Sequence, residues 1–258
     1  FIPGFMLASF YIIYIIVRCY LDPSKGPPRK KEDIPPLNER IKLLKKLLAP
    51  GLIALWIMVS IYGGIATVTE TAATGALAAL LIGIKRKKVN FKFLKDCLSY
   101  TLSVTGRLFW LTMGSTSLIG VFSIMGATAY LKSMVLGLPF EPLGIVLTMM
   151  GILVILGMFM DWIGILLLTS PIFVPIIIQL GFSPIWYGVL FSLNMQVSFV
   201  SPPFGPACFY IKSVAPPEIS ILDIFKGVLP FMLLQILAIT IVIMYPDIAL
   251  FLPNWMNK

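Results

Sequence analysis

The stretch NMQVSFVSPPFG (residues 194–205) lies inside a long apolar segment and contains two adjacent prolines, Pro202 and Pro203. A proline has no backbone N–H group and its ring clashes with the preceding helical turn, so a helix must open at this pair. Opening frees backbone carbonyl oxygens beside the hydroxyl groups of Ser198 and Ser201. At membrane depth, such irregular backbone is tolerated only where it is buried in protein or lines a wet cavity.

Carbonyl and hydroxyl oxygens suit a hard monovalent cation, and secondary transporters place ions and anionic substrates at broken helices near mid-membrane. A simple proline kink is the alternative interpretation. A kink alone does not explain the polar side chains grouped around the break. We therefore predict that an ion or substrate lies near Asn194, Gln196, Ser198, Ser201, Pro202, Pro203 and Gly205.

From residue 142 to residue 211 the only residue among Asp, Glu, Lys and Arg is Asp161. A charged side chain at mid-membrane is costly and is a functional-site hypothesis by default. Residues 143–180 fit a helical hairpin that enters and leaves on one side and breaks near Gly157 to Asp161, although two full spans fit equally. Asp161 could coordinate a cation, bind substrate or cap the second hairpin helix.

The composition of the whole chain is that of a membrane protein. Of its 258 residues, 59% are hydrophobic and 12% are charged, whereas soluble domains carry about 25% charged residues. This excludes an ordinary soluble domain, a disordered chain and a disulfide-rich module. The prediction is an all-α integral membrane protein, a polytopic helical bundle in the lipid bilayer.

The net charge of +9 comes from basic residues that gather in two segments, 18–48 and 85–96. Basic loops next to apolar spans are typical of the cytoplasmic side, which makes nucleic-acid binding the weaker interpretation. We expect a multi-pass protein of the bacterial or archaeal cytoplasmic (inner) membrane. Residues 37–48 form an amphipathic pattern, which fits a helix on the inner leaflet or one packed on the protein itself.

These patterns divide the chain into five segments. We expect a membrane helix (1–21), a cytoplasmic loop with the amphipathic helix (22–50), scaffold helices with a basic loop at 85–96 (51–136), a transport hairpin and broken helix (137–212), and a final membrane helix with a tail (213–258). Residues 51–84 should turn back between Gly63 and Glu70. We favour a structural or subunit-interface role for Glu70.

No catalytic constellation is present in the sequence. The chain has no histidine, which removes His-based zinc sites and Ser-His-Asp triads. It has no GxxxxGK[ST] phosphate-binding loop, and only one acidic residue is placed for intramembrane proteolysis. We therefore expect no enzymatic activity and no cofactor.

Three motifs carry a resemblance to a known family. They are GGIATVTETAATGALAALL (63–81), GMFMDWIGILLLTSPIFVPIIIQLGFSPIWYGVL (157–190) and NMQVSFVSPPFGPACFYIKSVAPP (194–217). Together they resemble the large membrane (permease) subunit of TRAP (tripartite ATP-independent periplasmic) transporters, near the branch associated with mannitol or chloroaromatic compounds. The resemblance covers only the second, C-terminal half of that subunit. It implies that the chain is one half of an inverted-repeat, elevator-type transporter whose N-terminal half is missing here.

The resemblance also implies a function and its residues. It implies import of an organic acid driven by sodium, with a sodium site at Gly157, Ser198, Ser201 and Phe204. Most family members have glycine where this chain has Ser198, and threonine where it has Ser201. The implied partners are a small membrane subunit and a periplasmic binding protein that delivers the substrate.

Two alternatives remain open from the sequence. The chain could be a membrane scaffold or interaction fragment of such a complex that transports nothing. It could also belong to a transporter driven by protons, with Asp161 as the carrier. The identity of the substrate does not follow from the sequence.

Overall fold

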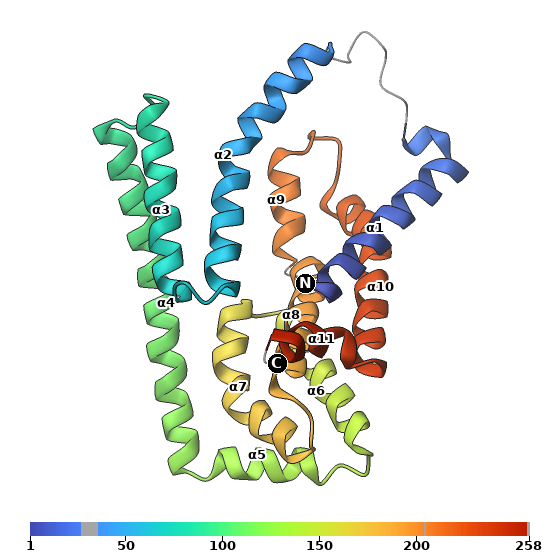
Figure 1. Cartoon of the computed structure of the whole chain (residues 1–258). Helices are drawn as coiled ribbons and strands as arrows, with labels where there is room; N and C mark the ends of the chain where they lie inside the picture. Colours follow the sequence, from blue (N-terminus) through green and yellow to red (C-terminus); the bar gives the residue numbers. More distant parts are fainter. Residues whose placement is uncertain (27–35, 204, 257–258) are drawn as a thin grey trace. The chain divides into compact units, whose positions relative to one another are not determined.

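The computed structural model describes residues 1–26, 36–203 and 205–256. Within these ranges every regular element is a helix (Figure 1). In chain order they are α1 (Ile2–Leu21), the 3₁₀ helix η1 (Pro23–Lys25), α2 (Leu37–Tyr62), α3 (Val68–Lys85), α4 (Phe91–Ile124), α5 (Ala127–Leu136), α6 (Pro142–Gly157), α7 (Trp162–Gln179), α8 (Pro184–Val200), α9 (Pro206–Val214), α10 (Ile221–Met244) and α11 (Asp247–Met256).

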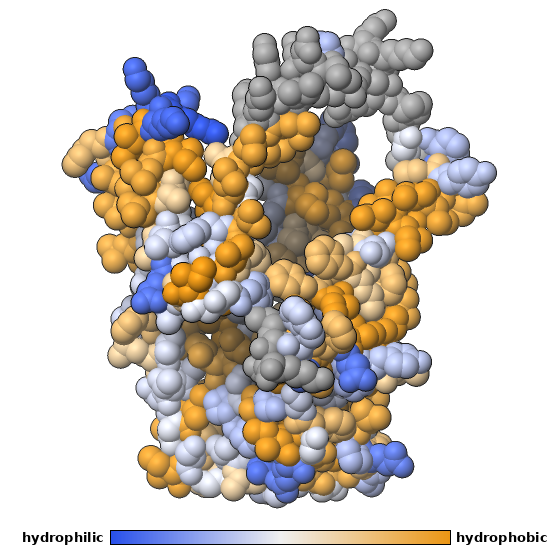
Figure 2. Space-filling view, in the orientation of Figure 1, coloured by the Kyte–Doolittle hydropathy of each residue, from blue (hydrophilic) through white to orange (hydrophobic). Residues whose placement is uncertain are grey.

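Five of these helices, α1, α3, α4, α7 and α10, are long and apolar enough to cross a bilayer within the described part of the chain. Hydrophobic residues also spread over much of the surface seen in Figure 2, and many large hydrophobic side chains are exposed. Exposed apolar surface of this extent is typical of a protein that contacts lipid or other membrane helices. The prediction of an all-α, polytopic membrane protein is confirmed.

The chain divides into two compact units, which are described separately. One consists of residues 26–106 and the other of residues 1–25 with 107–258, so that the boundary falls within α4. In the smaller unit α2 and α3 pack against each other after a short turn. Gly75 of α3 permits the close approach, because a Cβ there would lie 3.1 Å from Ile57 Cδ1. Trp56 Nε1 also donates to Thr74 Oγ1 at 3.1 Å.

The turn at 63–67 falls where the sequence predicts it, and Glu70 helps to begin α3. The Glu70 carboxylate accepts hydrogen bonds from the backbone N–H and the hydroxyl of Thr67, each at 2.8 Å. The Glu70 N–H in turn donates to Thr67 Oγ1 at 3.3 Å. This reciprocal arrangement is a capping box, which satisfies N–H groups that the first helical turn leaves free. It gives Glu70 a structural contact.

We predict that Thr67→Ala lowers the free energy of unfolding by about 1 kcal/mol, because the cap is lost. For a chain of this size the melting temperature should fall by roughly 2–4 °C. Thermal unfolding in detergent measures the shift. Thr101→Ala is the matched control, since the Thr101 hydroxyl bonds only the Cys97 carbonyl of its own helix. Equal shifts in the two variants would contradict a capping role.

Three helix boundaries differ from those expected. Helix α2 continues through Pro50 instead of ending there, because one proline removes a single N–H group and a long helix absorbs it. Helix α4 begins at Phe91, which shortens the basic connection to residues 86–90. Within the segment predicted as a tail, residues Asp247–Met256 form the helix α11. The side chains that would define the amphipathic face at 37–48 lie mostly outside the described residues.

In the larger unit α8 occupies the centre, in contact with α6, α7, α9, α10 and α11. Its buried side chains join a core that includes Leu153, Ile165 and Leu190, each 0% exposed. Trp186 Nε1 donates to the Val242 carbonyl at 2.9 Å. In a continuing helix that carbonyl would receive the N–H of residue 246, but residue 246 is a proline. Trp186 therefore completes the end of α10.

Candidate functional site: the hairpin tip and the helix break

The tip of the α6–α7 hairpin and the break between α8 and α9 lie side by side. Helix α6 ends at Gly157 and α7 begins after Asp161, while α8 ends at Val200 and α9 begins at Pro206. Both interruptions fall where the sequence places them. Between them is a cavity of only about 10 Å³, lined by Gly157, Met160, Asp161, Trp162, Ile165, Met195, Ser198, Phe199 and Pro206. Its size excludes an organic acid and leaves room for a bare ion.

Gly157 and Ser198 make the closest approach in this site. A Cβ placed on Gly157 would overlap with the Oγ and Cβ of Ser198 and would lie 3.6 Å from its Cα. Ser198 is 5% exposed, and its hydroxyl donates to the Asn194 carbonyl at 3.3 Å. A residue larger than glycine at position 157 cannot fit unless α6 and α8 separate.

The break after Val200 leaves carbonyl groups without their helical partners. In an α-helix the N–H groups of residues 202 and 203 would bond the carbonyls of Ser198 and Phe199, but both residues are prolines. The Ser201 N–H donates instead to the Ser198 carbonyl at 3.2 Å. Carbonyl and hydroxyl oxygens thus concentrate at the end of α8, which is the ligand chemistry of a hard cation.

Gly205 closes the break and starts α9. Its φ of +24° lies in the region that favours glycine. Its N–H donates to the Ser201 carbonyl at 2.9 Å. A Cβ at this position would lie 2.8 Å from Phe225 Cε1, so glycine is required by both conformation and space.

Asp161 is exposed and caps α7. Its carboxylate accepts a hydrogen bond from the Ile163 N–H at 3.3 Å, the position expected of an N-cap. Asp161 also lines the small cavity with Gly157 and Ser198. The cap therefore does not prevent the carboxylate from meeting an ion.

The other predicted site residues lie outside this cavity. Ser201 is 3% exposed and its hydroxyl donates to the Pro202 carbonyl at 3.3 Å. Pro202 and Pro203 are exposed on the break, and Glu70 belongs to the smaller unit. Phe204 lies outside the described residues.

Asn194 acts one turn before Ser198, as a link between helices. It is 1% exposed, and its Nδ2 donates to the Met150 carbonyl of α6 at 2.9 Å. This bond fixes α8 against α6 close to the point where Gly157 meets Ser198.

The sequence did not single out six residues that line the cavity: Met160, Trp162, Ile165, Met195, Phe199 and Pro206. Their only signal is proximity to the two breaks, since each lies within five residues of a helix end. Among the residues described, no three His, Cys, Asp or Glu side chains gather as a metal site would require.

We compared the sequence with models of known protein families. The family model described as "Tripartite ATP-independent periplasmic transporter, DctM component" matches residues 1–248. The chain belongs to this family. It therefore corresponds to part of the large permease of TRAP transporters and is a multi-pass membrane protein, and the relatives that it matches are named as transporter permeases, not as enzymes.

Individual relatives share limited sequence identity with this chain, but their matches cover most of its length. The ectoine TRAP transporter large permease protein TeaC of Halomonas elongata is 28% identical over 97% of this chain and 57% of its own length. The C4-dicarboxylate TRAP transporter large permease protein DctM of Pseudomonas aeruginosa is 26% identical over 99% and 58%. The isethionate TRAP transporter permease protein DctMQ of Oleidesulfovibrio alaskensis is 29% identical over 74% and 30%. The chain thus spans between about a third and somewhat over half of these relatives.

Proposed function

We propose that this chain takes part in sodium-driven import of an organic acid, as the C-terminal half of a TRAP large permease near the mannitol or chloroaromatic branch. The observation that carries the proposal is the contact between the hairpin tip at Gly157 and the broken helix at Ser198. Two interrupted helices that bring backbone oxygens to one small cavity are the arrangement of an ion site in secondary transporters. Relatives named for ectoine, C4-dicarboxylate and isethionate support a small organic substrate.

The residues at the cavity fit sodium better than a larger or softer ion. Gly157 and Ser198 line it directly, and Ser201 lies at the break beside it. With Phe204 these are the residues that the family resemblance gives to sodium. Bound sodium would couple substrate transport to the sodium gradient. The chain's part is to present oxygens, exclude bulk water and hold α6 against α8 through Asn194.

An elevator motion would carry this site across the membrane. Helices α6 to α8 and α10 share one core, so they can move together as a rigid group. The complete machine would include the rest of the large permease, a small membrane subunit and a periplasmic binding protein, in the cytoplasmic membrane of a bacterium or archaeon. The longer ectoine and C4-dicarboxylate permeases support the first of these components, the rest of the large permease.

Uptake of a labelled organic acid into proteoliposomes that hold the complete complex tests the proposal. An inward sodium gradient is compared with potassium, each with and without the binding protein. We expect accumulation only with both sodium and the binding protein. Uptake driven equally well by a proton gradient would mean that protons, and not sodium, drive the transport. No uptake by a complex that folds and assembles would favour a scaffold role.

We predict that Asp161→Asn reduces uptake about tenfold, the effect of losing about 1.4 kcal/mol of ion or substrate stabilisation. Asparagine caps a helix as well as aspartate does, so the amount of protein in the membrane should not change. Glu141→Gln is the matched control, since Glu141 precedes α6 at the same position but makes no side-chain cap. Full activity of Asp161→Asn would mean that the only role of Asp161 is to cap α7.

A further inference from the structure

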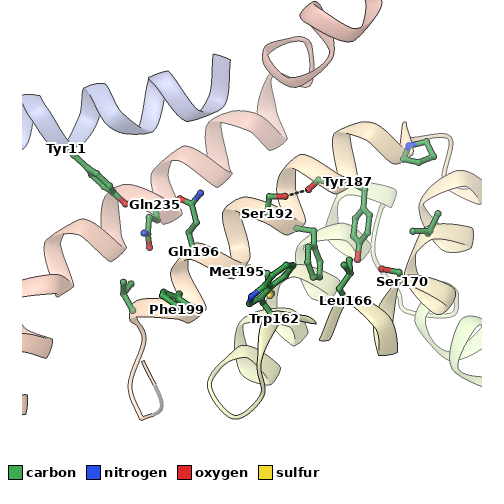
Figure 3. Close-up of a pocket in the computed structure, with 15 residues that line it drawn as sticks. Tyr11, Trp162, Leu166, Ser170, Tyr187, Ser192, Met195, Gln196, Phe199 and Gln235 are labelled. Carbon is green, nitrogen blue, oxygen red and sulfur yellow. Dashed lines mark hydrogen bonds between the residues drawn. The ribbon is translucent and has the colours of Figure 1, made fainter. Parts of the chain in front are cut away.

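Two cavities of the larger unit differ in charge. One, of about 720 Å³, lies between α1, α7, α8 and α10, and the described residues that line it include no Asp, Glu, Lys or Arg (Figure 3). The other, of about 470 Å³, lies between α1 and α10 and is lined by Arg18 and Lys226 among others. The described residues that line this second cavity include no acidic side chain. The second cavity is therefore positively charged.

The two basic side chains lie near the ends of their helices. Helices α1 and α10 pack against each other (Figure 1). Arg18 is in the last turn of α1, and Lys226 is within the first two turns of α10. Both side chains are exposed. Long basic side chains near the ends of membrane helices hold their charged groups at the level of the lipid headgroups, so the charged part of the cavity lies at that level.

The acidic side chains nearest in sequence make other contacts. The Asp223 carboxylate accepts hydrogen bonds from the backbone N–H and the hydroxyl of Ser220, at 3.1 and 2.6 Å. It also attracts Lys226 on the same helix. The Asp22 carboxylate accepts a hydrogen bond from the Ser24 hydroxyl at 2.5 Å. Neither carboxylate lines the cavity, so an anion placed there would meet two positive charges and would offset their mutual repulsion.

The cavity becomes apolar toward the middle of the two helices. Tyr14 lies one turn before the arginine in α1, and Phe231 lies five residues after the lysine in α10. Their rings meet edge to face, with centroids 5.3 Å apart. Ile15 and Pro230 line the same part of the cavity. The cavity thus has charged groups at the ends of the helices and apolar groups deeper in the membrane.

This order of charged and apolar groups matches a phospholipid, which carries its phosphate above its acyl chains. Arginine binds phosphate through paired N–H groups, and lysine binds it as a point charge. A soluble anion would leave the apolar part of the cavity uncovered. A zwitterionic headgroup would bring its ammonium group to two cations, where no acidic side chain lines the cavity to receive it.

We propose that this cavity binds an anionic glycerophospholipid, with the phosphate between Arg18 and Lys226 and an acyl chain along Tyr14 and Phe231. Basic pockets between membrane helices on the cytoplasmic side are suited to such headgroups. Arg18 also begins the basic segment 18–48, which is typical of that side. The lipid site is independent of which solute the transporter carries and of the ion that drives it.

Native mass spectrometry of the intact transporter tests the site. The complex is released from nanodiscs of phosphatidylethanolamine that contain increasing fractions of phosphatidylglycerol, and the retained lipids are identified by mass. Each basic side chain near an anionic headgroup contributes about a factor of five in affinity. The double variant Arg18→Gln, Lys226→Gln should therefore bind phosphatidylglycerol about 25-fold more weakly and should retain one molecule fewer than the wild type.

A matched control removes the same two kinds of charge elsewhere. Lys85→Gln, Arg86→Gln changes one lysine and one arginine at the end of α3, and neither lines the cavity. This control should retain as much phosphatidylglycerol as the wild type. Equal retention by the control and by the double variant at positions 18 and 226 would overturn the proposal.

A second variant tests the space and leaves both charges in place. Ile15 lines the cavity and is 48% exposed, so Ile15→Trp should fold normally while its larger side chain fills part of the cavity. We expect at least a threefold loss of retained phosphatidylglycerol. Wild-type retention in Ile15→Trp would mean that the lipid binds outside the cavity, which would overturn the proposal.

The competing occupants are tested in the same experiment. Displacement of the lipid by millimolar inorganic phosphate would make the cavity a site for soluble anions. Loss of phosphatidylethanolamine instead of phosphatidylglycerol from the double variant would make it a site for zwitterionic lipid. Either result would overturn the proposal, whereas retention of phosphatidylglycerol in the presence of phosphate supports it.

Discussion

Gly157→Ala should weaken the sodium dependence of uptake roughly 10- to 100-fold. The added methyl group would overlap with the Ser198 side chain, and overpacking of a tight contact costs about 1–3 kcal/mol. The strain acts on the oxygens around the small cavity, so it should weaken sodium binding. Each 1.4 kcal/mol is a factor of ten in affinity. The half-maximal sodium concentration for uptake in proteoliposomes measures the effect.

The pair Gly157 and Ser198 allows a sharp control. The double variant Gly157→Ala, Ser198→Gly removes the hydroxymethyl group that the new methyl group meets, so it should recover much of the lost sodium affinity. Gly151→Ala is the matched single variant, since it lies on the same helix and a Cβ there has nothing within 4 Å. An unchanged sodium dependence in Gly157→Ala would count against the ion site.

Gly205→Ala should have a comparable effect through a different cause. Alanine at a φ of +24° is strained by about 1–2 kcal/mol, and its Cβ would also meet Phe225 and the Ser201 carbonyl at 2.8 and 3.0 Å. The start of α9 must then shift. We expect a fall of about 2 kcal/mol or more in the free energy of unfolding and loss of most uptake, measured by thermal unfolding and transport.

The two causes can be separated at Gly205. Adding Phe225→Leu to Gly205→Ala removes the ring that the new Cβ meets but leaves the backbone strain, so rescue should be partial. Gly227→Ala is the control, because a Cβ at residue 227 has nothing within 4 Å. Wild-type stability and uptake in Gly205→Ala would show that the break tolerates another conformation.

The breaks in the helices could be predicted from sequence because their causes are local. Pro202 and Pro203 remove N–H groups wherever they stand, and Asp161 is a natural first residue before a helix. The turn before Glu70 follows from the same local chemistry. Each of these features lies within a few residues of the position expected.

Contacts between helices could not be predicted in the same way. The residues next to Gly157 do not show that it packs on Ser198, 41 positions later in the sequence, and only the family resemblance placed the two at one site. The same holds for Asn194 and the Met150 carbonyl, which meet only because α6 and α8 cross there. Helix α2 likewise continues through Pro50, because one proline removes a single N–H group and the long helix absorbs that loss. A sequence motif does not show this.

The bond from Trp186 to the Val242 carbonyl has a consequence for substitutions at the far end of α10. Because Pro246 leaves that carbonyl without its helical donor, the end of α10 depends on an indole that is 56 positions earlier in the chain. Trp186 and Pro246 should therefore change together among homologues. A chain with an ordinary residue at 246 could exchange the tryptophan for phenylalanine, whereas a chain that keeps the proline could not.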